Sequence, residues 1–84
     1  MTDKRIIELQ EILIDRLKPS YINIIDDSHL HVGHVGAEDG KLHITIEISS
    51  SKLNDMKRIH QHRLIYKQMD SVKHHFHAVS IKII

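Results

Sequence analysis

Nine histidines and no cysteines are the most distinctive chemical feature of this 84-residue sequence. Imidazole is a common metal ligand, and its unperturbed pKa of about 6.5 makes its charge respond to mild acidification. Because no thiol is present, the chain can form no disulfide and supplies no thiolate for catalysis or for a metal. Histidine is therefore the residue type whose positions decide what chemistry the chain can perform.

Three of the histidines, His29, His31 and His34, fall within a segment from 29 to 41 that also contains glycines. Such a loop can adjust its shape and bring an imidazole to a metal that another protein holds. Two alternatives stay open: each histidine is an exposed surface side chain, or the three bind zinc or nickel adventitiously. The second alternative is the weaker one, because a floppy loop gives no fixed tetrahedral geometry.

Two further histidines lie in regions with regular apolar patterns. His77 is at the start of the last predicted strand, where a side chain can reach past the sheet edge. It also shares its period-two position with Val79 and Ile81, so the alternative is a half-buried histidine bonded to backbone. His62 falls on the apolar stripe of a predicted helix, which favours a hydrogen-bonded core histidine. The neighbouring Arg63 is a candidate partner contact through a bidentate pair with a carboxylate, or else a solvated charge.

The remaining histidines surround these positions. His43 is on the outward face of a predicted strand, and His74 and His75 precede the last strand, so all three can flank His77. An exposed polar edge is the preferred interpretation for them. His60 is expected to face solvent.

The elements that position these side chains follow from hydrophobic spacing. Thr2 is expected to cap a first helix that Pro19 ends, because proline cannot continue the hydrogen-bond ladder. Its apolar stripe recurs every three or four residues and is made by Ile6, Leu9, Leu13 and Leu17, widened by Ile7 and Ile14. A second helix is predicted from about Asn54 to Val72, with an inner face of Ile59, His62, Ile65, Tyr66, Met69 and Val72.

Three strands are predicted from β-branched composition and alternation: residues 21–25, 42–49 and 76–84. The clearest is the second strand, where Leu42, Ile44, Ile46 and Ile48 share one face. The first two suit an antiparallel pair, and the helix between the second and third suits a parallel pair. We therefore expect one α+β domain over residues 1–84, in the order helix-strand-strand-helix-strand, with one layer of helices on a three-stranded mixed sheet.

Three segments, in this order, resemble motifs of the BolA family. The stretch Asp26-Asp27-Ser28-His29-Leu30-His31-Val32-Gly33-His34-Val35-Gly36-Ala37 resembles the family loop. His62-Arg63-Leu64-Ile65-Tyr66 resembles its helix motif, and His77-Ala78-Val79-Ser80-Ile81 resembles its last strand. The chain departs from the family at Leu53-Asn54-Asp55, where Phe-x-Gly is usual, and at Gln61, where Arg or Asn is usual. Asp tolerates a left-handed turn, which keeps that turn feasible.

The resemblance implies a KH-like (class II) BolA fold and a monothiol glutaredoxin partner. It also implies a two-iron, two-sulfur cluster shared with the glutaredoxin's cysteine and a bound glutathione, so that the isolated chain holds no cofactor. The family's ligand positions map onto His77 and onto His31, with His34 as the runner-up in the loop. Arg63, His62 and His29 are then the expected partner contacts.

Two other functions are weighed against this one. Transcriptional regulation, which the resemblance also implies, is expected to use basic residues of the second helix: Lys57, Arg58, Arg63 and Lys67. The formal net charge of +1 and the scarcity of aromatic residues argue against strong nucleic-acid binding. An enzyme is not expected, since no triad or paired-carboxylate motif is present. We expect the protein to be cytoplasmic, without membrane attachment, and to be a monomer or a weak dimer.

Overall fold

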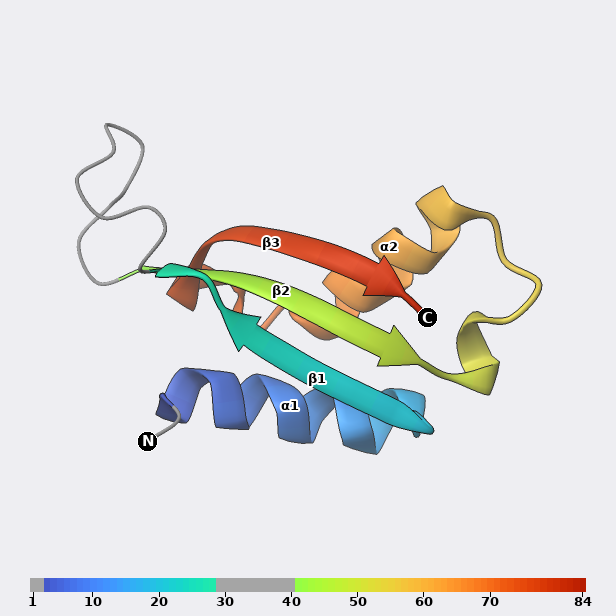
Figure 1. The fold of residues 1–84 in the computed structure, drawn as a ribbon, viewed down its shortest axis with the longest axis horizontal. Coiled ribbons are helices and arrows are strands. Elements are labelled where there is room, and N and C mark those ends of the chain that lie inside the picture. Colours follow the sequence, from blue (N-terminus) through green and yellow to red (C-terminus); the bar gives the residue numbers. More distant parts are fainter. Residues whose placement is uncertain (1–2, 29–40) are drawn as a thin grey trace.

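The structure, a computed structural model, describes residues 3–28 and 41–84. Within these ranges it contains two α-helices and three strands, joined in part by short 3-10 turns (Figure 1). In chain order the elements are α1 (Lys4–Leu17), β1 (Tyr21–Asp26), β2 (Leu42–Ser49), η2 (Ser51–Leu53), α2 (Arg58–Gln68), η3 (Lys73–His75) and β3 (Phe76–Ile83). No helix in these two ranges has the length and apolar character needed to cross a bilayer.

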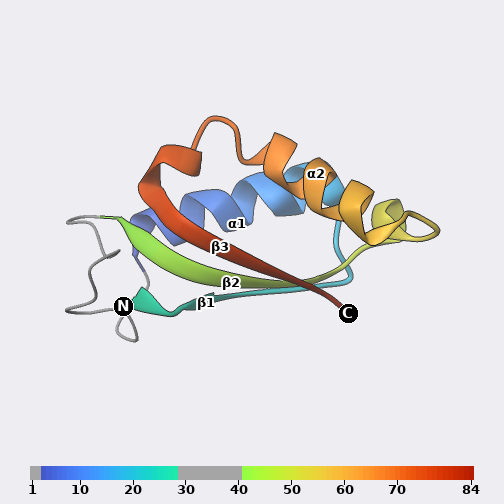
Figure 2. The ribbon, with the colours of Figure 1, turned by 90° about the horizontal axis from the view of Figure 1, so that it is seen from above.

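The three strands form one mixed sheet in the order β1-β2-β3. β1 and β2 are antiparallel, and β2 and β3 are parallel. Both helices lie on the same face of the sheet, as Figure 2 shows from above. The predicted fold class, element order and strand directions are confirmed.

Helix α1 contributes one buried stripe to the core, made by Ile6, Leu9, Leu13 and Leu17. The predicted widening of this stripe was wrong, because Ile7 and Ile14 are 44% and 43% exposed. The N-cap is Asp3 rather than Thr2, since the Asp3 carboxylate accepts the backbone N–H of Arg5. At the other end Lys18 takes a left-handed conformation with φ of 45°, so the helix ends at Leu17, two residues before Pro19.

The connection between β2 and α2 is longer than predicted. The segment expected to begin a helix at Asn54 is instead a turn, in which Asp55 has a positive φ of 63°. This left-handed residue stands where glycine is usual, and it delays the start of α2 to Arg58.

Helix α2 is also narrower in its contact with the core than predicted. Ile65 within it and Met69 and Val72 beyond it are buried as expected. Ile59 and Tyr66 are 55% and 45% exposed, so their placement on the inner face was wrong. The physical reason is that α2 spans only three turns. The apolar contact with the core is continued by Met69 and Val72, which follow the helix, and not by further residues of α2.

The parallel ladder between β2 and β3 contains a one-residue irregularity near its start. Leu42 is the partner of Phe76, but the next residue, His43, is the partner of Ala78. His77 is therefore an extra residue in β3, as in a β-bulge. The bulge removes His77 from the alternation that Val79 and Ile81 continue.

Candidate functional site

His77 is exposed at the bulge that begins β3. The alternative prediction of a half-buried His77 aligned with Val79 and Ile81 was wrong, because the bulge changes the direction of its side chain. Its ring packs against that of His43, with a centroid separation of 4.9 Å and an interplanar angle of 50°. The histidines of β2 and β3 are thus brought together at one end of the sheet.

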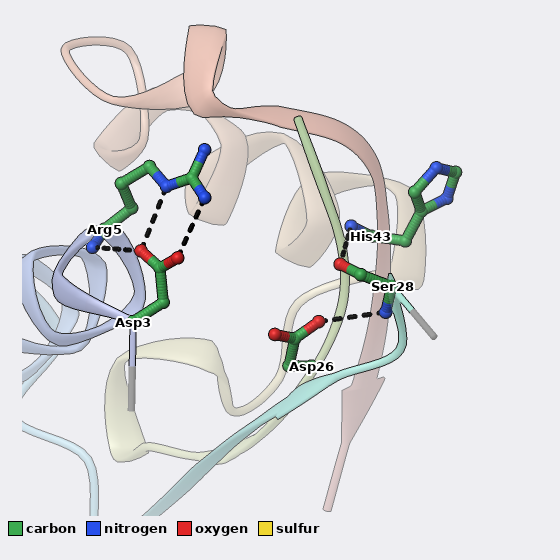
Figure 3. A network of polar contacts seen from close by, with 5 residues as sticks. All are labelled: Asp3, Arg5, Asp26, Ser28 and His43. Atoms are coloured by element: carbon green, nitrogen blue, oxygen red, sulfur yellow. Dashed lines mark hydrogen bonds and ion pairs between the residues drawn. The ribbon is translucent and has the colours of Figure 1, made fainter. Parts of the chain in front are cut away.

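His43 is buried, with only 7% of its surface exposed, so the prediction of an exposed polar edge was wrong for this residue. Its backbone N–H donates to Ser28 Oγ at 3.1 Å, and its carbonyl accepts the N–H of Asp27 at 2.7 Å. Ser28 is held in turn, because its N–H donates to the Asp26 carboxylate at 2.9 Å (Figure 3). These bonds tie the end of β1 to the start of β2 beneath the histidine pair.

The two residues that flank segment 29–40 lie at the same end of the sheet as His77. Ser28 follows β1 and contacts His43, while Lys41 immediately precedes Leu42, the register partner of Phe76. The predicted loop histidines His29, His31 and His34 lie outside the described residues. Their assignments as ligands or partner contacts therefore stay predictions.

Charged residues at the start of α1 stabilise this end of the molecule. Arg5 donates through its guanidinium to both oxygens of Asp3, at 2.9 and 2.8 Å (Figure 3). The Arg5 hydrogen bonds lower the pKa of Asp3 from 3.8 to about 2, and the charge of His75 adds a smaller effect in the same direction. The same bonds raise the pKa of Arg5, with a further contribution from the charge of Asp26. The ion pair thus fixes the start of α1, where the Asp3 carboxylate caps the helix.

The donor chemistry at this corner fits iron. Imidazole nitrogens replace cysteine sulfurs on one iron of some two-iron, two-sulfur clusters. The exposed His77 ring can offer such a nitrogen to a cluster outside the chain, whereas the buried His43 ring can support it from behind. Within residues 3–28 and 41–84, no group of three or more His, Asp or Glu side chains is arranged to hold a metal ion.

The predicted partner contacts on α2 are not brought to this corner. His62 is half-buried and, with Arg58 and Gln61, lines a hollow against Ile81 to Ile84, at the opposite end of β3 from His77. Its Nε2 atom is enclosed and has no hydrogen-bond partner among the described residues, so the expectation of a bonded core histidine was wrong for that nitrogen. Arg63 is exposed on the same helix.

The basic residues suggested for nucleic acid are exposed but are not gathered in one hollow. Arg58 lines the hollow against the end of β3. Lys67 lines a separate hollow with Arg16, Gln68, Asp70 and Ser71. The four residues of this prediction, which are Lys57, Arg58, Arg63 and Lys67, therefore do not share one hollow.

Sequence reasoning missed two contacts in this part of the molecule. The first is the packing of the buried His43 ring against the His77 ring, which alternation within either strand does not reveal. The second is a hydrogen bond from the Tyr66 hydroxyl to the Val79 carbonyl at 3.0 Å, which joins α2 to β3. A tyrosine on the edge of an apolar stripe was the available signal for the second contact.

The fold and site define a small α+β domain that presents an exposed histidine at one end of a mixed sheet. Comparison with known families is specific: the family described as BolA-like protein matches residues 13–84. This chain belongs to the BolA family.

Relatives and solved structures agree with this assignment. The chain is 30% identical over 83 residues to the chloroplastic protein BOLA1 of Arabidopsis thaliana, covering 94% of this chain and 52% of that protein. It is 34% identical over 58 residues to a BolA-like protein of Dictyostelium discoideum, covering 69% and 48% of the two chains. The chain thus spans about half the length of these curated relatives.

Among solved structures, the BolA domain of SufE1 from Arabidopsis thaliana matches with a TM-score of 0.84 and 28% identity, covering 99% of this chain and 93% of that one. BolA1 from the same plant matches with a TM-score of 0.79 and 28% identity, covering 98% and 92%. The fold of these BolA domains is the fold of this chain.

Proposed function

We propose that this protein is an adaptor that binds a monothiol glutaredoxin and shares a two-iron, two-sulfur cluster with it through His77. The observation that carries the proposal is the exposed His77 ring, turned outward by the bulge and backed by the buried ring of His43. Membership of the BolA family supports the choice of partner. The role is one of binding and transfer in iron–sulfur cluster trafficking or iron regulation, not of catalysis.

The chain's own part in this function is to present a nitrogen ligand in a fixed direction. The cluster, when bound, supplies iron coordination sites and the capacity to hold an electron. His77 offers one imidazole nitrogen, and ring packing against His43 limits the directions that the His77 ring can take. A ligand that is already oriented loses less conformational freedom when it binds.

A second ligand from this chain is expected within segment 29–34, with His31 preferred over His34. The attachment of this segment beside the histidine pair supports the proposal, because Ser28 contacts the backbone of His43. Since the chain has no cysteine, the thiolate ligands come from the glutaredoxin and its bound glutathione. His29, His62 and Arg63 remain candidate contacts for that partner.

The experiment is reconstitution of the full chain with a monothiol glutaredoxin, glutathione, iron and sulfide. We expect a coloured heterodimer, seen by absorption spectroscopy and by mass spectrometry under native conditions. His77→Ala should alter the visible spectrum and shorten the lifetime of the cluster in the complex, because a nitrogen ligand is lost. His60→Ala changes an exposed histidine of α2 and serves as the matched control.

Failure of the wild-type chain to form a cluster-containing heterodimer would overturn the adaptor role. A heterodimer with an identical spectrum and lifetime in His77→Ala would retain the partner but remove His77 from the ligand set. Steeply salt-dependent binding to duplex DNA in the absence of any glutaredoxin complex would favour the regulatory alternative instead.

A further inference from the structure

The end of β3 that lies farthest from His77 borders a hollow of about 700 Å³. Arg58, Gln61 and His62 line it from α2, and Ile81 to Ile84 line it from the strand. Ile81 follows His77 by four residues of extended chain, so this surface begins roughly 10–15 Å from the histidine corner. None of the residues that line it is a proposed cluster ligand.

The outer edge of β3, on the side away from β2, has no neighbouring strand among the described residues. β3 is an edge strand, and Ile84 donates its N–H inward to the Ile48 carbonyl at 2.9 Å. Because successive residues of a strand direct their N–H and C=O groups to opposite sides, the odd-numbered residues point away from β2. The Tyr66 bond to the Val79 carbonyl confirms this direction independently.

Tyr66 divides the free edge into a closed part and an open part. At Val79 the Tyr66 hydroxyl occupies the outward carbonyl. Beyond it, the alternation directs the N–H and C=O groups of Ile81 and Ile83 to this same outer edge, which borders the hollow. Neither residue has a hydrogen bond across that edge to another described residue. Two outward residues offer four backbone hydrogen bonds, which is the pattern that an added strand uses.

The side chains around this edge favour an acidic occupant. Arg58 brings a permanent positive charge to the hollow. No Asp or Glu is among the residues that line it. Ile84, which is 65% exposed, adds an apolar surface that a side chain of an extended peptide can cover.

We propose that this hollow binds an extended, acidic peptide segment of a partner protein, which adds to β3 as a fourth strand. Its backbone pairs with Ile81 and Ile83, and one of its carboxylates pairs with Arg58. The site goes beyond the cluster function, and it allows the protein to hold a second partner while His77 is engaged at the other end of the strand.

The test uses the full chain as bait for a library of random dodecapeptides displayed on phage. We expect the selected peptides to be enriched in Asp or Glu next to β-branched residues. In nitrogen–proton NMR spectra, binding of a selected peptide should slow amide exchange of Ile81 and Ile83 by about tenfold or more, because those N–H groups become hydrogen-bonded.

A charge reversal supplies the matched comparison. Arg58→Glu should weaken binding of the selected peptide by about tenfold or more, since a charge-assisted hydrogen bond is replaced by repulsion. Lys67→Glu makes the same change of charge on the same helix, outside the hollow, and should leave the affinity within about twofold.

Three results would overturn the proposal. The first is that no acidic peptide is selected, or that Arg58→Glu and Lys67→Glu weaken binding equally. The second is that Ile81 and Ile83 show no added protection. The third is that a single-stranded oligonucleotide, or a second copy of the chain detected by light scattering, occupies this edge and excludes the peptide.

Discussion

The rings of His43 and His77 pack 4.9 Å apart, one buried in β2 and the other exposed at the start of β3. The contact lies at the bulge, where His77 is the extra residue of β3 between the partners of Leu42 and His43. The buried His43 imidazole therefore packs against the exposed His77 imidazole and limits its orientation. This arrangement connects the packing of the sheet to the ligand role proposed for His77.

Replacing His43 tests whether its ring supports His77 by packing. We expect His43→Ala to lower the free energy of unfolding by about 1–3 kcal/mol, because it removes a buried ring. It should also change the NMR chemical shifts of the His77 imidazole. His43→Phe keeps an aromatic ring and should recover most of the stability. Equal losses in the two variants, with unchanged His77 shifts, would show that packing is not the role of His43.

The ion pair between Asp3 and Arg5 predicts how the free energy of unfolding depends on pH in the acid range. The pKa of Asp3 is about 2 in the folded chain against an ordinary value of 3.8. Between these values the unfolded chain binds more protons, so this contribution to stability is lost as the pH falls from about 4 to 2. Above that range it is fully present.

A neutral amide at position 3 isolates this effect. Asp3→Asn keeps an acceptor for helix capping but cannot ionise, so its unfolding free energy should lack the rise between pH 2 and pH 4 that the wild type gains from Asp3. Asp3→Ala should in addition lose about 1 kcal/mol at neutral pH, because the cap is removed. Denaturant titrations at several pH values measure both. Parallel pH profiles for the wild type and Asp3→Asn would contradict the account.

Ser50 joins the end of α1 to the end of β2. It is 3% exposed, and its hydroxyl donates to the Leu17 carbonyl while accepting the N–H of Lys52. Ser50→Ala should lower the free energy of unfolding by about 1–3 kcal/mol, because it leaves a helix-end carbonyl without its partner. The adjacent Ser51 is exposed, so Ser51→Ala should change stability by less than about 0.5 kcal/mol. Thermal and urea unfolding of both variants would measure these losses. Equal losses in Ser50→Ala and Ser51→Ala would contradict the role of the Ser50 hydroxyl.

The hydrogen bond from Tyr66 to Val79 predicts a smaller effect. Tyr66 is 45% exposed, so Tyr66→Phe should cost about 0.5–1 kcal/mol of stability. Tyr21 is 47% exposed, and Tyr21→Phe is the matched control, with no measurable loss expected. A larger loss in Tyr21→Phe than in Tyr66→Phe would contradict the assigned bond.

The repeating apolar positions made much of the fold predictable. The stripe from Ile6 to Leu17 and the alternation from Leu42 to Ile48 each describe an element that buries one face, so helix and strand types followed directly. The parallel pairing of β2 and β3 followed from the helix between them. The late start of α2 did not follow, because it depends on a left-handed turn at Asp55 that propensity alone does not require.

The candidate site was less predictable than the fold. The resemblance to BolA proteins selected His77, but whether its side chain faces the core or solvent depends on a one-residue bulge. His43 is buried against the His77 ring, and its backbone is bonded to Ser28 and Asp27. These are contacts between residues far apart in the chain, which local periodicity does not contain.

The most direct measurement of the central claim is electron–nuclear double resonance (ENDOR) spectroscopy of the reduced cluster in the glutaredoxin complex. The chain is labelled with nitrogen-15 histidine, and the partner is unlabelled. We predict nitrogen-15 coupling to the cluster in the wild type and in His74→Ala, an exposed histidine beside the same strand, with at least one coupling lost in His77→Ala. Identical coupling in His77→Ala and the wild type would contradict the assignment of His77 as a ligand.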